Sequence, residues 1–444
     1  MAESLCEIIT LGGMVLGIVH VPAGIYIAVQ RSSTSRRADG LYPVTPTQGN
    51  KETFTMSEQE LFVVDGVIHT PTQCIDRGWL HVAGGLIREI GSGSPSVSKG
   101  NTARVSAEGR HVVPGFIDIH VNGGGGSLAI DATEDAIKNI ARAHAKYGTT
   151  AMLPSTIAVD ETALRSTVRT IGEMTSRPSG GARVLGVHLE APFLNPAKGG
   201  AHRKEFLLMP SVRKFRELYD LSNGSIRILS IAPELDGALE LVAYAKELGV
   251  VTALAHSEAD FAATGGAIAA GMTLCDHLFN GMLPFTNRSP GPIGAFLTDD
   301  TTFVELISDG YHVHPAVMKV VIRAKGPDRV ALVTDAVTPA GTDMDSFVIL
   351  GTTLKVRGSS CFTPDGTLAG SALTMNKAVK VILDNNVASL EDVLKMASLT
   401  PARVLGLDRK KGTLEVGKDA DLVVADDDLN VFLTVSEGRI VYSS

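Results

Sequence analysis

The chain has few cysteines and no excess of positive charge. Cys6, Cys74, Cys275 and Cys361 are scattered without CxxC spacing, so the sequence indicates neither a zinc knuckle nor a disulfide framework, and we expect a cytoplasmic protein. The formal net charge is -8 at pH 7, and no segment is dense in Lys and Arg. We therefore expect no nucleic-acid partner. The 444 residues are 44% hydrophobic and 20% charged, which is typical of a globular protein with an enzyme-sized core.

The first 55 residues differ from the rest of the chain. Ile8 to Val29 is a nearly continuous apolar run of 22 residues, which is just long enough to span a bilayer. The run has no basic segment before it, and it is interrupted by Gly12, Gly13, Gly17, His20 and Pro22. A membrane anchor is therefore the less favoured interpretation. We expect residues 1–58 to be an N-terminal extension, an apolar segment followed by a polar linker, which is poorly ordered and not part of the fold.

The remaining sequence predicts two domains. Residues 59–112 and 411–444 contain short β-type segments separated by Gly-rich turns, and we expect the two ends to form one small β-sandwich. Residues 113–410 contain eight apolar strand candidates, and helical patterns separate most of them. This alternation predicts an α/β fold, a catalytic (β/α)8 TIM-like barrel.

Four potential metal ligands stand at the ends of four predicted strands. Glu190 follows VLGVHL, His256 follows VVTALA, His277 ends MTLCDH and Asp335 follows VALVT. In a (β/α)8 barrel the catalytic residues gather at the C-terminal ends of the strands. One Glu with two His suits Zn²⁺ or Fe²⁺ and leaves a coordination position open. Asp335 can then accept a proton from the activated water, so the pattern predicts a metal-dependent hydrolytic site.

Eight segments carry a further signal, in this order: PGFIDIHVNGG, VHLEAPFLNPAKGGAH, AHSEA, DHLFNGM, RSPGPIGA, DGYHVHP, VTDAVTPAG and GTLAGSALTM. From about residue 61 to the C-terminus they resemble the amidohydrolase superfamily, and within it the branch of the N-acetylglucosamine-6-phosphate deacetylases. The resemblance implies a metal-dependent hydrolase of a linear amide bond. Its substrate would be N-acetyl-D-glucosamine 6-phosphate, its products D-glucosamine 6-phosphate and acetate, and its context amino-sugar catabolism by a homodimer.

The resemblance also implies a role for individual residues. Glu190, His256 and His277 match the metal ligands, Asp335 the catalytic acid and base, and His202 the residue that polarises the acetamide carbonyl. The residues that match substrate contacts are His202, Asn280, the backbone of Gly281, Arg288, His312, Leu368 and Ala369. Arg288 and His312 match phosphate contacts that are often supplied across the dimer interface, and Arg suits this role because its planar fork binds phosphate at two positions.

The first predicted strand departs from the simplest pattern. Superfamily members with two metals end this strand in HxH and some single-metal deacetylases have QxN, whereas this chain has His120-Val121-Asn122. An amide is a poor ligand beside an imidazole, so we expect one zinc or iron ion per subunit, with His120 as a possible further ligand. His188, two residues before Glu190, is expected to support the site by hydrogen bonding.

Two other interpretations stay open. The substrate could be a related amino sugar, such as N-acetylgalactosamine 6-phosphate or an acylated sugar without phosphate, because the sequence does not fix the configuration at C4. The protein could also be a non-catalytic barrel that acts as a scaffold. Such a protein would be expected to lose its metal ligands first, and all of the expected ligands are present here.

Overall fold

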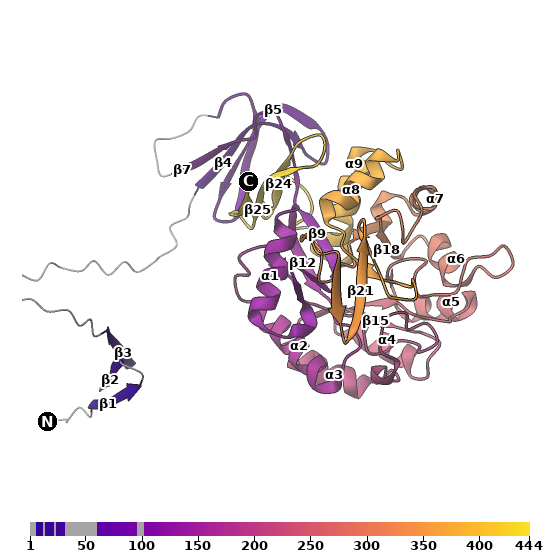
Figure 1. Cartoon of the computed structure of the whole chain (residues 1–444). Coiled ribbons are helices and arrows are strands. Elements are labelled where there is room, and N and C mark those ends of the chain that lie inside the picture. Colours follow the sequence, from indigo (N-terminus) through magenta and orange to yellow (C-terminus); the bar gives the residue numbers. More distant parts are fainter. Residues whose placement is uncertain (1–5, 12–13, 22–23, 32–59, 96–101) are drawn as a thin grey trace, which may run out of the picture. The chain divides into compact units, whose positions relative to one another are not determined.

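The apolar N-terminal run forms β-strands. The computed structural model describes residues 6–11, 14–21, 24–31, 60–95 and 102–444, in two compact units, Met1–Thr55 and Met56–Ser444. The first unit contains an antiparallel sheet of β1 (Cys6–Leu11), β2 (Met14–Val21) and β3 (Gly24–Arg31) (Figure 1). The Ile and Val residues that made this run a candidate anchor also favour strands. No helix among the described residues is long and apolar enough to cross a membrane. The expected polar linker lies outside the described residues from residue 32 onward.

Strands from both ends of the second unit pair in one sheet. Its members are β4 (Glu60–His69), β5 (Cys74–Ala83), β6 (Leu86–Ser92), β7 (Thr102–Ser106), β8 (His111–Pro114), β24 (Leu422–Ala425), β25 (Val431–Ser436) and β26 (Arg439–Ser443). The order is β26-β25-β24-β8-β4-β5-β6, and β7 pairs with β4. β24 pairs antiparallel with β8, so the last strands of the chain share a buried core with the first strands of this second unit. Residues of this core include Leu61, Leu80, Leu422 and Val435.

The middle of the chain forms parallel strands. They are β9 (Phe116–Val121), β12 (Thr149–Pro154), β13 (Arg183–Val184), β14 (Val187–Leu189), β15 (Ile226–Ile231), β16 (Val251–Leu254), β17 (Leu274–Cys275), β18 (Phe303–Ile307) and β19 (Val330–Val333). They lie in the orders β13-β12-β9 and β14-β15-β16-β17-β18-β19. Isolated parallel bridges join Ser155 to His188 and Val121 to Ala336. Most of these strand residues are buried, as expected for a parallel sheet that is covered on both faces.

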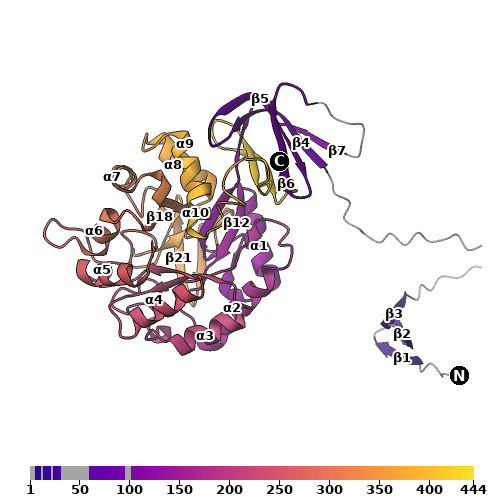
Figure 2. The ribbon, with the colours of Figure 1, turned by 180° about the vertical axis from the view of Figure 1, so that it is seen from behind.

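Helices alternate with these strands and lie around their outside (Figures 1 and 2). They are α1 (Glu134–Ala145), α2 (Glu161–Met174), α3 (Val212–Leu221), α4 (Ala238–Glu247), α5 (Phe261–Ala270), α6 (Gly291–Thr298), α7 (Pro315–Lys325), α8 (Met375–Asp384), α9 (Leu390–Leu394) and α10 (Thr400–Val404). Side-chain oxygens of Thr133, Asp160 and Asp260 accept hydrogen bonds from the first turns of α1, α2 and α5, which satisfies backbone donors that have no partner within the helix. Gly237, with φ 83°, directly precedes the first residue of α4.

Smaller elements complete the fold. They are β10 (Gly123–Gly124), β11 (Ser127–Leu128), the 3-10 helices Ala129–Asp131, Lys204–Phe206 and Pro327–Arg329, the π-helical turn Lys395–Leu399, and the strands β20 (Ser346–Ile349), β21 (Thr352–Arg357), β22 (Ser360–Phe362) and β23 (Leu368–Ser371). The last four form an antiparallel sheet in the order β20-β21-β22-β23. Sequence patterns did not predict this sheet, which supplies part of the wall of the cavity described next.

Candidate active site

Three of the predicted site residues have a strained backbone. His256, His277 and Asp335 follow β16, β17 and β19 and have φ values of 43°, 26° and 48°. Non-glycine residues in this left-handed region cost on the order of 1–3 kcal/mol each. Such strain persists only where the surrounding structure imposes it, and it gathers at functional sites. Glu190 follows β14 directly, so the four predicted strand-end residues lie at the same ends of parallel strands.

The side chains of Glu190, His256 and His277 converge on one point. Glu190 Oε1 lies 3.4 Å from His256 Nε2 and 3.5 Å from His277 Nε2. Ligand atoms that surround a tetrahedral ion at bond lengths of about 2.0–2.2 Å are separated by about 3.3–3.6 Å. All three residues are buried, and His277 Nε2 has no hydrogen-bond partner. These side chains therefore form a group that can hold a metal ion.

The protonation of His256 is set by its neighbours. Its Nδ1 lies 2.8 Å from the carbonyl oxygen of Lys198, and a carbonyl only accepts, so Nδ1 carries the proton and Nε2 presents a lone pair to the site. Burial lowers the pKa of His256 to about 4, which keeps the ring neutral as a metal ligand requires. Gly281 packs against this ring: a Cβ at Gly281 would lie 2.7 Å from His256 Nδ1, and its φ is 63°.

Asp335 lies beside the metal-ligand group, and its side chain is 13% exposed. Its Oδ1 accepts a hydrogen bond of 2.7 Å from Asn122 Nδ2. Burial raises the pKa of Asp335 above the usual range of an aspartate. A carboxylate with a raised pKa is a stronger base and a usable acid nearer neutral pH, which suits a residue that must accept and return a proton.

His202 presents a hydrogen-bond donor to the same point. The backbone N–H of Ala158 donates to His202 Nδ1 over 3.2 Å, so the ring proton is on Nε2. This Nε2 lies 3.3 Å from Glu190 Oε1. A donor that is fixed in this way can also stabilise negative charge on a carbonyl oxygen bound at the site.

A cavity of about 560 Å³ opens above these groups. Of the predicted site residues, those that line it are Glu190, His202, His256, His277, Asn280, Gly281, His312, Asp335, Leu368 and Ala369. His312 lines the cavity of its own chain, and its Nδ1 lies 2.7 Å from Asp309 Oδ2. Arg288 is exposed and is not among the lining residues. His120 is fully buried behind Glu190, with Nε2 3.3 Å from Glu190 Oε2.

Comparison with known proteins gives the family. The amidohydrolase family profile matches residues 111–441. The chain belongs to the amidohydrolase family. It is 33% identical over 389 residues to N-acetylglucosamine-6-phosphate deacetylase of Bacillus subtilis (strain 168), a match that covers 87% of this chain and 98% of the relative. It is also 33% identical over 370 residues, which are 82% of this chain and 96% of the relative, to N-acetylgalactosamine-6-phosphate deacetylase of Escherichia coli O157:H7.

Solved structures show the same similarity. N-acetylglucosamine-6-phosphate deacetylase from Pasteurella multocida has a TM-score of 0.81 and 31% identity, covering 87% of this chain and all of the solved chain. A mutant of the Mycobacterium smegmatis deacetylase, in complex with N-acetyl-D-glucosamine-6-phosphate, has a TM-score of 0.80 and 31% identity, with the same coverage. The predicted membership of the amidohydrolase superfamily is therefore confirmed.

Two buried acids of this amidohydrolase were not predicted from the sequence. Glu305 lies in β18 and Asp276 lies directly before His277, and neither side chain is exposed to solvent. A carboxylate in the middle of the apolar segment FVELI was a usable signal, because acids are almost never fully buried unless they are paired. Glu305 pairs with His120 and Asp276 pairs with His188.

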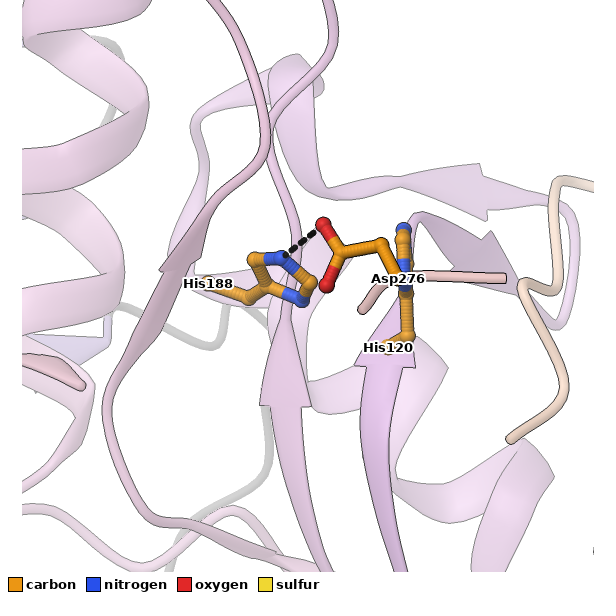
Figure 3. Close-up of side chains that lie close together, drawn as sticks. All are labelled: His120, His188 and Asp276. Atoms are coloured by element: carbon orange, nitrogen blue, oxygen red, sulfur yellow. Dashed lines mark ion pairs between the residues drawn. The ribbon is translucent and has the colours of Figure 1, made fainter. Parts of the chain in front are cut away.

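His120, His188 and Asp276 form a second group whose atoms lie close enough to hold a metal ion. Figure 3 shows the ion pair of His188 and Asp276, which measures 3.3 Å from Nε2 to Oδ2, with His120 beside it. Both ring nitrogens of His188 already have partners, because Nδ1 lies 3.0 Å from the carbonyl oxygen of Ile119 and Nε2 lies 2.9 Å from Ser230 Oγ. We therefore interpret this group as a hydrogen-bonded support, as predicted for His188.

Proposed function

We propose that this amidohydrolase hydrolyses the acetamide of N-acetyl-D-glucosamine 6-phosphate, which gives D-glucosamine 6-phosphate and acetate in amino-sugar catabolism. The observation that carries the proposal is the arrangement of Glu190, His256 and His277 at the floor of a cavity that Asp335 and His202 also line. The substrate class comes from the deacetylases to which the chain is similar over most of its length.

We propose a closed (β/α)8 barrel over residues 113–410 as the catalytic domain. The two isolated bridges at the ends of the parallel strand orders support closure. So does a buried cluster to which β9, β12, β15, β16, β17, β18 and β19 all contribute, because the strands of a barrel fill its interior with side chains from several of them. Residues 59–112 and 411–444 would form the small domain, and residues 1–58 would lie outside both. We propose a cytoplasmic location.

The cofactor in this proposal is one zinc or iron ion per subunit, held by Glu190, His256 and His277. The donor set contains oxygen and imidazole ligands without a thiolate, which suits either metal. When bound, the ion supplies Lewis-acid activation of water and of the amide carbonyl.

The protein side chains supply the proton transfers. Asp335 takes a proton from the attacking water and later gives it to the leaving amine, which leaves poorly unless it is protonated as the C–N bond breaks. His202 Nε2–H donates to the acetamide oxygen, where negative charge develops in the transition state. Burial of Asp335 supports its double role, because it raises the pKa of the carboxyl group.

We propose that the phosphate end of the substrate contacts Asn280, the backbone of Gly281 and His312, and that the sugar contacts the backbone of Leu368 and Ala369. All five line the cavity. Arg288 is exposed and outside the cavity of its own chain, so its proposed phosphate contact requires a second copy of the chain. This supports a homodimer in which Arg288 reaches the neighbouring site, while His312 serves its own site.

A second candidate substrate is N-acetylgalactosamine 6-phosphate. The relative from Escherichia coli O157:H7 that carries this activity in its name is as similar to the chain as the Bacillus subtilis relative is, at 33% identity. The two sugars differ only in the orientation of one hydroxyl group, and the acetamide on which the proposed catalytic groups act is the same in both.

The test is acetate release by purified protein that has been stripped of metal and reloaded separately with zinc, iron, manganese or cobalt. Both N-acetylhexosamine 6-phosphates are compared with unphosphorylated N-acetylglucosamine as a control. We expect metal-dependent release that favours N-acetylglucosamine 6-phosphate. Faster release from the galactosamine series would replace the first candidate with the second, and no release with any metal from a folded protein would refute the deacetylase proposal.

A further inference from the structure

Asp309 holds His312 at the wall of the cavity. Its Oδ2 lies 2.7 Å from His312 Nδ1 and accepts a hydrogen bond of 2.5 Å from Ser360 Oγ. Its Oδ1 accepts hydrogen bonds of 2.8 Å from the backbone N–H groups of Tyr311 and His312. The Asp309 side chain is not exposed, and that of His312 is 4% exposed. A buried carboxylate with four donors is fixed in place, because each donor offsets part of the cost of removing the charge from water.

The carboxylate also fixes a proton on the His312 ring. Burial alone would raise the pKa of Asp309, but hydrogen bonds from His312 and Ser360 outweigh it, and the pKa lies below the usual range of an aspartate. Asp309 is therefore ionised at neutral pH and can only accept, so His312 Nδ1 carries a proton. The ring lines the cavity, and the nitrogen that Asp309 leaves for a ligand is Nε2.

A phosphate group at His312 needs a second proton on the ring. In the neutral ring with its proton on Nδ1, Nε2 is a lone pair, and the oxygens of a phosphate dianion also offer only lone pairs. In the imidazolium, Nε2–H donates a charge-assisted hydrogen bond to the phosphate, while the Asp309 carboxylate stabilises the cation from the other side. The protonated ring therefore binds the group that the neutral ring repels.

We infer that Asp309 is a positioning residue that makes His312 bind the substrate phosphate as an imidazolium, so that a proton enters the site with the phosphorylated substrate when the free ring is neutral. The inference rests on the proposed function, in which His312 contacts the phosphate. It deepens that function, because affinity for a phosphorylated sugar then depends on pH through this ring, whereas affinity for the unphosphorylated sugar does not.

Other ionisable groups act on the same ring. Asp335 follows β19 and interacts electrostatically with His312, so both carboxylates favour the imidazolium. Burial raises the pKa of Cys361, which interacts with both carboxylates, to about 12, so its thiol stays neutral. The remaining ionisable residues that line the cavity are Glu190, His202, Arg203, His256 and His277.

Asp309→Asn should reverse the protonation of the ring and keep the shape of the side chain. The backbone N–H groups of Tyr311 and His312 require an oxygen where Oδ1 lies, so the amide nitrogen takes the place of Oδ2. Its N–H then donates to His312 Nδ1, which moves the proton of the neutral ring to Nε2. The variant therefore offers phosphate an N–H donor without taking up a proton.

Ser360→Ala is the matched control. It removes one hydrogen bond to Asp309 Oδ2 but leaves the carboxylate and its contact with His312. Ser360 is buried and does not line the cavity. This variant separates a loosened Asp309 from an Asp309 that has lost its charge.

The first measurement is calorimetry of substrate binding between pH 6 and 9. Metal-loaded Asp335→Asn protein is used, because it binds substrate without efficient turnover and lacks the titration of Asp335 itself. N-Acetylglucosamine 6-phosphate is titrated in buffers of different ionisation enthalpy, with N-acetylglucosamine as the control. For the phosphorylated sugar only, proton uptake should rise towards about one with increasing pH, and the dissociation constant should rise by up to about tenfold per pH unit. Adding Asp309→Asn should abolish the uptake, and adding Ser360→Ala should not.

Steady-state acetate release gives a second readout, in protein that retains Asp335. At pH 6, Asp309→Asn should raise KM for the phosphorylated sugar by about 5- to 10-fold, because a neutral donor replaces a charge-assisted one. Its kcat should stay within about threefold of wild type, and the two KM values should converge as the pH rises. A purely structural defect would lower kcat as well and would leave the pH dependence unchanged.

The outcomes separate this inference from the proposed function. If Asp309→Asn does not fold, His312→Gln carries the test, because it leaves Asp309 in place and must also abolish the proton uptake. Affinity that is independent of pH without proton uptake in the Asp335→Asn protein, or undiminished uptake after Asp309→Asn or His312→Gln, would overturn the inference. Absence of acetate release by wild type, with proton-linked binding intact, would instead refute the proposed deacetylation.

Discussion

Replacement of Asp335 by asparagine separates chemistry from binding. Asparagine has nearly the same shape, and its Oδ1 can still accept the 2.7 Å hydrogen bond from Asn122 Nδ2. Glu190, His256 and His277 are untouched, so the metal content should not change. The substitution therefore removes only the group that accepts and returns a proton.

The magnitude follows from that single loss. A positioned general acid or base contributes about 10²–10⁴-fold to the rate, which corresponds to about 3–5 kcal/mol of transition-state stabilisation. We expect kcat for acetate release to fall by this amount while KM stays within about threefold. Stability should not fall with activity, because burial disfavours the ionised form of Asp335 and raises its pKa. A neutral amide at this position should leave the free energy of unfolding unchanged or raise it.

The pH dependence gives an independent test. Asp335 must be ionised to act as a base, so kcat/KM should fall as the pH drops through its pKa, which burial raises above the usual value. The acidic limb of the wild-type profile should therefore lie above the pH at which an exposed aspartate titrates, and it should be absent from the residual activity of Asp335→Asn. The assay is acetate release between pH 4 and 9.

Asp260→Asn is the control for Asp335→Asn. Asp260 accepts a hydrogen bond from Ala263 N at the start of α5 and does not line the cavity. Asparagine caps helices about as well as aspartate does. It should retain wild-type kcat. A kcat of Asp335→Asn within about threefold of wild type, with metal content intact, would remove Asp335 from the acid–base role.

Three further predictions concern other parts of the chain. His256→Ala should bind less metal and lose the gain in free energy of unfolding that metal gives wild type. That gain is about 2.7 kcal/mol when the free metal concentration is 100 times the dissociation constant. Equal unfolding curves with and without zinc in wild type would contradict this. Arg288→Ala should raise KM for the phosphorylated sugar only. If Arg288 acts across a two-fold dimer, an equal mixture of Arg288→Ala and Asp335→Asn subunits should contain intact active sites, about a quarter of the total. His144 is buried, its Nε2 lies 3.0 Å from the carbonyl oxygen of Gly123, and burial lowers its pKa. Its contribution to stability is therefore present above about pH 6.5 and lost as the pH falls below that value. His144→Gln should therefore reduce the pH dependence of urea unfolding between pH 7 and 5, by at most one proton, and an unchanged slope would contradict the assignment.

Sequence alone predicted the residues at the strand ends. Glu190, His256, His277 and Asp335 could be found because each follows a short apolar segment, and a strand places its last side chain at a known edge of a parallel sheet. The family could be recognised from ordered motifs, and its membership is confirmed. These signals are local, since each depends on a few adjacent residues.

The tertiary structure decided which distant residues meet. Glu305 and His120 are 185 positions apart in the sequence, which is far beyond the reach of any local pattern. Their 2.9 Å contact follows from the pairing of strands around the site. The position of Arg288 outside the cavity of its own chain and the four-stranded sheet that lines the cavity were likewise not readable from the sequence. Sequence determined which side chains stand at the strand ends, because the strand period is local. Only folding determined their partners and protonation, because a buried carboxylate acts on whichever imidazole the packing brings within about 3 Å.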